Sequence, residues 1–150
     1  MVREAGKILE MEETVRRTPE VSLKDVFLRA AAGLDDGRAE VVAEALDWLQ
    51  RGFDAHYAAG ATDDDTLLVG DSAYAQAVET IARLDEPRFV GVASRMIRDG
   101  AGLIAAGKGV TLEQWTPHLA GLLDIISGEG LERSEARIRE AAEKVWRRDG

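Results

Sequence analysis

Apolar residues recur at steps of three and four positions along most of the chain, which is the period of an amphipathic α-helix. Together with caps, glycines and prolines, this pattern predicts about seven helices. We expect them at about residues 2–17, 22–32, 37–59, 65–84, 87–106, 111–126 and 131–148. In the last helix, Leu131, Ile138, Ala142 and Val145 are expected to face the core, with Trp146 as a further candidate. The sequence therefore predicts one all-α domain over residues 1–150, a single-domain helical bundle without strands.

Local signals mark several of the helix ends. Ser22 is an N-cap candidate, and Pro87 stands where a first helical residue is expected. Thr111 and Gln114 have the spacing of a capping box, so one helix begins after Thr111 unless Pro117 begins or kinks it. These signals predict helix ends without any knowledge of the packing.

The composition excludes several classes of function. Apolar residues at 45% and charged residues at 31% indicate a globular chain, and the absence of cysteine excludes disulfides, cysteine zinc sites and a thiol nucleophile. The net charge of −9 disfavours nucleic acid and anionic membranes as partners. No uncharged run approaches the roughly 20 apolar residues of a membrane span. We therefore expect a cytoplasmic protein with no nucleic-acid partner and no stable membrane insertion.

Two glycine motifs and two histidines are candidates for binding sites. Residues 102–108 read G-L-I-A-A-G-K, the first seven positions of a phosphate-binding loop, but Gly109 stands where serine or threonine would bind magnesium. Residues 100–105 fit the dinucleotide fingerprint, yet neither motif follows a predicted strand. We interpret both as parts of a helix that ends in glycine. His56 and His118 lack the spacing of a helical zinc site.

Four segments in the middle of the chain form a recognisable set. They read Phe53-Asp54-Ala55-His56, Leu67-Leu68-Val69-Gly70-Asp71-Ser72-Ala73-Tyr74-Ala75, Ala82-Arg83-Leu84 and Val92-Ala93-Ser94-Arg95-Met96-Ile97. Together they resemble the trans-polyprenyl diphosphate synthases over about residues 40–127. The likeness is greatest to the small subunit of two-component hexaprenyl or heptaprenyl diphosphate synthases, which has aspartate–x–histidine before a glycine–aspartate helix. The resemblance implies a truncated isoprenoid-synthase fold.

The carboxylates depart from the pattern of a catalytic synthase. Catalysis in that family needs two D-D-x-x-D clusters, whose oxygen atoms hold magnesium ions against a diphosphate. The first cluster would fall at residues 54–58, where only Asp54 remains, and residues 63–67 lack the fifth-position aspartate. For the second cluster the chain offers only Asp124. We therefore expect no prenyltransferase activity from this chain alone, no cofactor bound by it, and magnesium in a catalytic partner.

The resemblance implies a non-catalytic regulatory subunit of a heteromeric polyprenyl diphosphate synthase. A larger catalytic subunit would carry out chain extension, and this chain would help to set the product length. The resemblance also implies pairing through the helices at about 65–84 and 87–106. The expected partner interface consists of Leu68, Gly70, Ala73, Tyr74, Ala77 and Ile81, whose small members form a ridge that permits close helix approach.

Three other interpretations remain open on the sequence. The helix at 65–84 is apolar on several faces, so it could equally be the central core helix of a self-sufficient bundle. The chain could be an acidic helical adaptor or a homodimeric structural module unrelated to isoprenoids. It could also be a divergent enzyme that uses Asp54, residues 63–65 and Asp71 around a metal ion.

Overall fold

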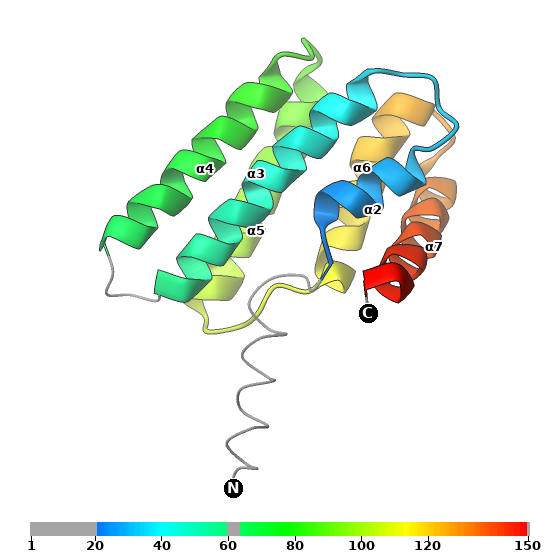
Figure 1. The fold of residues 1–150 in the computed structure, drawn as a ribbon. Coiled ribbons are helices and arrows are strands. Elements are labelled where there is room, and N and C mark those ends of the chain that lie inside the picture. The colour runs from blue at the N-terminus through cyan, green and yellow to red at the C-terminus, as the bar shows by residue number, and fades with distance from the viewer. Residues whose placement is uncertain (1–20, 60–63, 150) are drawn as a thin grey trace, which may run out of the picture.

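The computed structural model describes residues 21–59 and 64–149, which fold into six helices (Figure 1). Their bounds are Leu23–Ala30 for α2, Arg38–Ala59 for α3, Asp64–Ala82 for α4, Pro87–Ala105 for α5, Leu112–Ser127 for α6 and Leu131–Asp149 for α7. No strand occurs among these residues, so the predicted all-α class is confirmed. The helix expected at 2–17 lies outside the described residues. Within them, no helix is long and apolar enough to cross a membrane.

The helix ends follow the local signals in the sequence. Ser22 caps α2 by accepting a hydrogen bond from the backbone N–H of Asp25 at 3.1 Å. Thr111 and Gln114 form a reciprocal capping box, with bonds of 2.8 and 3.3 Å. Helix α6 therefore begins after Thr111, and Pro117 lies inside it.

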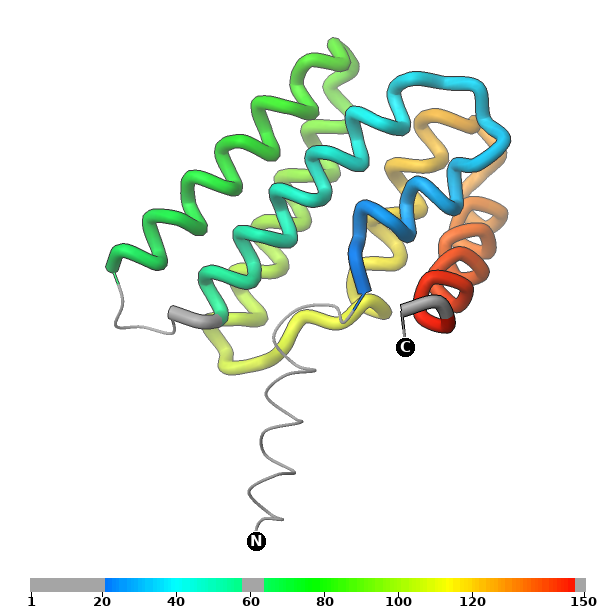
Figure 2. Tube along the Cα trace, viewed as in Figure 1, coloured from blue at the N-terminus to red at the C-terminus, as the bar shows by residue number. Residues whose placement is uncertain are grey.

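The helices form two neighbouring groups (Figure 2). The long helix α3 packs against α2, α4, α5 and α6, and so connects the group of α4 and α5 with the group of α2, α6 and α7. Helix α4 lies at the edge of the bundle and packs against α3 and α5 (Figure 1). Among the six described helices, none covers the remaining side of α4.

The core lies where both groups meet α3. Its largest fully buried side chains are Trp115, Phe27, Phe53, Phe89, Leu23, Leu46, Leu49, Ile81, Met96, Leu119, Leu122 and Leu123. In α7, Ile138 and Val145 are buried as predicted. Leu131 is 59% exposed, so its predicted burial is wrong. Leu131 is the first residue of α7, and Trp146 near the other end of this helix is also exposed, at 51%.

Candidate functional site

Two of the four segments that carry the resemblance meet where α3 packs against α4. His56 on α3 places its Nε2 atom 2.9 Å from Oδ1 of Asp71 on α4. The imidazole stacks on the ring of Tyr74, with centroids 4.9 Å apart and ring planes inclined by 3°. The aspartate–x–histidine segment and the glycine–aspartate helix are therefore in direct contact, which their separation in sequence did not reveal.

Two glycines make room for these rings. A Cβ atom on Gly70 would lie 2.7 Å from Nε2 of His56, and one on Gly52 would lie 2.5 Å from Cδ1 of Tyr74. Each of these Cβ atoms would also come within 3.2 Å of the carbonyl oxygen of the other glycine. The two helices are thus close enough here that only glycine fits without a shift of the neighbouring rings.

Tyr74 continues an aromatic row into the core. Its ring contacts Phe53 edge-on at 5.6 Å, and Phe53 stacks on Trp115 at 5.0 Å. At the far end of the row, Trp115 lies 5.6 Å from the ring of His118. The Nε2 atom of His118 is 3.1 Å from Oδ2 of Asp99, so each terminal histidine has an aspartate partner.

The Tyr74 phenol in this aromatic row is neutral and is packed among other rings. Burial raises the pKa of the Tyr74 phenol, and the negative charge of Asp71 raises it further, so the phenol stays neutral. The hydroxyl group has no hydrogen-bond partner in the described part of the chain. No group of three side chains that could hold a metal ion occurs among residues 21–59 and 64–149. Each histidine–aspartate pair holds an imidazole ring at one end of the aromatic row.

The other acidic candidates are dispersed. Asp54 is exposed on α3, and Asp64 and Asp65 are exposed in the first turn of α4, where negative charge is favourable. Asp63 lies outside the described residues. Asp124 accepts a hydrogen bond from the backbone N–H of Gly130 at 2.7 Å and so fixes the turn after α6.

Of the six expected interface residues, five are buried or largely buried within this chain and one is exposed. Four are buried in this chain, namely Gly70, Ala73, Ala77 and Ile81, and Tyr74 is largely buried against Phe53 and His56. Leu68 is 65% exposed. The small-residue ridge does permit close helix approach, but at Gly70 the approaching helix is α3 of the same chain. Of the six, Leu68 is the side chain most available to a partner in this conformation, and the interface itself stays a prediction.

A shallow hollow lies beside Leu68 on the surface shared by α3 and α4. Its volume is about 420 Å³, and its lining comes from Trp48, Arg51, Leu68, Val69, Ser72 and Ala73. The Arg51 guanidinium lies 4.7 Å from the centroid of the Trp48 ring. Sequence reasoning overlooked Trp48 and Arg51. The sequence did contain a signal for this surface, because Trp48 lies beside the apolar stripe of its helix and not on it.

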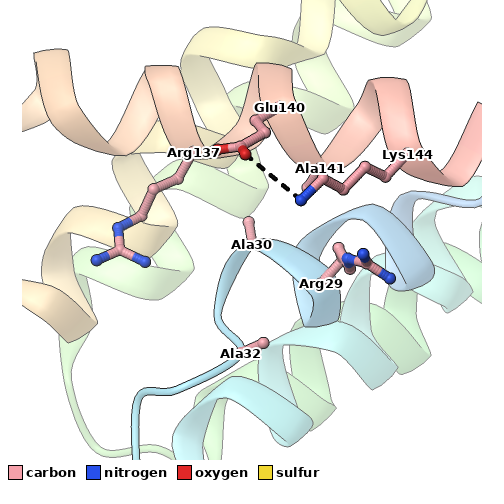
Figure 3. A pocket seen from close by; sticks show the side chains of 7 residues that line it. All are labelled: Arg29, Ala30, Ala32, Arg137, Glu140, Ala141 and Lys144. Carbon is pink, nitrogen blue, oxygen red and sulfur yellow. Dashed lines mark ion pairs between the residues drawn. The ribbon is translucent and has the colours of Figure 1, made fainter.

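A second, smaller hollow between α2 and α7 is rich in basic side chains, among them Arg29, Arg137 and Lys144 (Figure 3). The Arg137 guanidinium points away from that of Arg29 and pairs with Glu129 at 2.9 Å. Lys144 pairs with Glu140 at 3.4 Å. The three cations do not converge on a common point, so this hollow is not built to hold an anion.

The phosphate-loop-like segment is the end of α5. The backbone N–H of Lys108 donates to the carbonyl of Leu103 at 2.8 Å, and that of Gly107 donates to Ile104 at 2.9 Å. Gly107 has a φ of 78°, so the turn is a Schellman motif. The interpretation of this segment as a helix that ends in glycine is confirmed.

Comparison of the chain with family models, with curated proteins and with solved structures finds no match in any of the three.

Proposed function

We propose that this chain is a non-catalytic interaction subunit that docks onto a larger protein through one face of α3 and α4. This docking face consists of Trp48, Arg51, Leu68, Val69 and Ser72. The observation that carries the proposal is the exposure of two adjacent large apolar side chains on α4, Leu68 at 65% and Val69 at 63%.

The energetics of this face favour a protein partner. Burial of a leucine or valine side chain contributes about 1.5–3 kcal/mol, so Leu68 and Val69 lose this stabilisation in the free chain. Trp48 and Arg51 add a stacked aromatic and guanidinium pair, and tryptophan and arginine are enriched among the residues that dominate binding. Of the described helices, α3 and α5 are the ones that pack on α4, so a partner helix could pack on the side that these two leave open.

The proposed partner is the larger catalytic subunit of a heteromeric polyprenyl diphosphate synthase. The resemblance of residues 53–56 and 67–75 motivates this choice. The dispersed carboxylates of the described residues agree with a division of labour in which the partner holds the magnesium ions. In such a complex this chain would act by its position beside the partner's active site, and would influence the length of the product.

The test is a matched pair of charge substitutions. Leu68→Glu places a carboxylate in the docking face, and Leu131→Glu places one at a similarly exposed leucine on α7. Each variant is co-expressed with a catalytic synthase subunit from the same source. We expect Leu68→Glu to abolish co-purification and to reduce incorporation of labelled isopentenyl diphosphate at least tenfold, because an unpaired buried carboxylate is costly. Leu131→Glu should leave both unchanged.

Three results would contradict the proposal. The first is incorporation of isopentenyl diphosphate by this chain without another protein, which would indicate a divergent enzyme. The second is equal binding of the synthase subunit by both variants, which would show that the docking face does not contact the partner. The third is a homodimer of the free chain that Leu68→Glu converts to a monomer in light scattering, without any binding to the synthase. That result would favour the homodimeric module.

A further inference from the structure

A third hollow, of about 690 Å³, lies where α5 ends and α6 begins. Leu103, Ala106 and Trp115 provide its apolar lining, and polar side chains on it include Arg98, Lys108 and Gln114. The volume lies within the range of about 300–1,000 Å³ that is usual for small-molecule sites. This hollow is separate from the docking face, so the inference below does not depend on the proposed function.

The charge around the hollow is opposite to that of the whole chain. Arg98 and Lys108 are positive and Asp99 is negative, which leaves a surplus of one positive charge in a protein of net charge −9. Asp99 is already engaged, because its oxygens lie 3.1 Å from His118 and 3.7 Å from Arg98. The Schellman turn fixes the backbone of Lys108 beside the hollow. One additional negative charge would balance this site.

The other polar groups of the hollow are hydrogen-bond donors. The Oε1 atom of Gln114 accepts from the backbone N–H of Thr111 at 2.8 Å, which leaves its amide NH₂ group to donate. The indole N–H of Trp115 is buried and has no acceptor within the described residues. This nitrogen is not exposed to the hollow, so the donors that a ligand meets there are those of Arg98, Lys108 and Gln114.

We infer that this hollow binds a small amphipathic carboxylate. The carboxylate is held by Arg98 and Lys108 and accepts from Gln114, while the apolar body of the ligand lies against Leu103 and Trp115. A carboxylate carries one charge and only acceptor atoms, which matches both the surplus charge and the donor set. A dianionic phosphate would leave an excess negative charge beside Asp99.

The probe is sodium decanoate, titrated by calorimetry and by the fluorescence of Trp115. Trp48 and Trp146 are replaced by phenylalanine, so that Trp115 is the remaining tryptophan. We expect saturable binding with a shift in the Trp115 emission. Decanol should bind at least tenfold more weakly, and decyl phosphate should bind no more tightly than decanoate. Decylammonium should not bind, because it meets like charges at the hollow.

Single substitutions test whether Arg98 and Lys108 bind the carboxylate. Arg98→Gln and Lys108→Gln should each weaken decanoate binding about threefold to tenfold, because each removes an exposed charge-assisted hydrogen bond. The control is Arg83→Gln, which removes another exposed cation, in the turn between α4 and α5 at the opposite end of α5, and should change nothing. The inference is overturned if decanoate does not saturate, if decanol binds as tightly, if decyl phosphate binds more tightly, or if neither variant weakens binding.

Discussion

Gly70→Ala tests the close contact between α3 and α4 directly. The new Cβ atom would lie 2.7 Å from Nε2 of His56 and 3.2 Å from the carbonyl oxygen of Gly52. The backbone of α3 cannot yield without disturbing the core around Phe53, so the His56 ring has to move. With its side chain 21% exposed, His56 can rotate outward, but it then leaves both Asp71 and Tyr74.

The expected loss of stability is the balance of two effects. Overpacking of a close contact costs about 1–3 kcal/mol. Replacement of a helical glycine by alanine regains about 0.8–1 kcal/mol through helix propensity. The net free energy of unfolding should therefore fall by about 1 kcal/mol in Gly70→Ala. The control is Gly102→Ala on α5, where a Cβ atom meets nothing within 4 Å, and which should raise stability by up to about 1 kcal/mol.

A double-mutant cycle with His56→Ala isolates the clash. Once the imidazole is absent, Gly70→Ala keeps its helix-propensity gain and meets only the carbonyl oxygen of Gly52. It should then be neutral or stabilising by up to about 1 kcal/mol, which gives a coupling energy of about 1–2 kcal/mol between positions 56 and 70.

The assay is urea unfolding followed by circular dichroism at neutral pH, with all variants measured under the same conditions. The reasoning fails if Gly70→Ala stabilises the chain as much as Gly102→Ala does. It also fails if the coupling energy is below about 0.5 kcal/mol, which is the usual limit of additivity for independent sites.

Three further predictions concern the core, a helix start and a turn. Ala77→Arg should destabilise the free chain by about 3 kcal/mol or more, because Ala77 is fully buried; a thermal midpoint lowered by only a few degrees would contradict this. Hydrogen bonds from the side chain and backbone N–H of Arg38 lower the pKa of Asp36 to about 2, so this pair stabilises the fold above about pH 4 and the contribution disappears as the pH falls towards 2. In Arg38→Gln the Asp36 pKa, followed by NMR of its carboxyl carbon, should return towards 3.8, and an unchanged value would refute the assignment. Asp85→Gly should raise stability by about 0.5–1 kcal/mol in thermal unfolding, because Asp85 has a φ of 55°, and a loss of stability would be evidence against a left-handed residue there.

Within residues 21–59 and 64–149, the sequence alone determined the six helices, and their ends to within about two residues. Ser22, the Thr111–Gln114 pair and the turn at Gly107 each act through hydrogen bonds to backbone groups at most five residues away. Such interactions are complete within one segment, so the order of residue types is enough to predict them. The absence of alternating apolar runs determined the all-α class in the same way.

The tertiary structure alone decided which faces of these helices are covered. Helix α4 is apolar on several sides, so the spacing of its apolar residues did not show which side would be buried. The structure buries Ala73 and Ala77 and leaves Leu68 and Val69 exposed. The contacts of His56 with Asp71 and of His118 with Asp99 span 15 and 19 residues, and they depend on the crossing of separate helices. A helical repeat specifies which residues share a face. What lies against that face is set by the packing of other helices, and for α4 that is the close approach of α3 at its glycines.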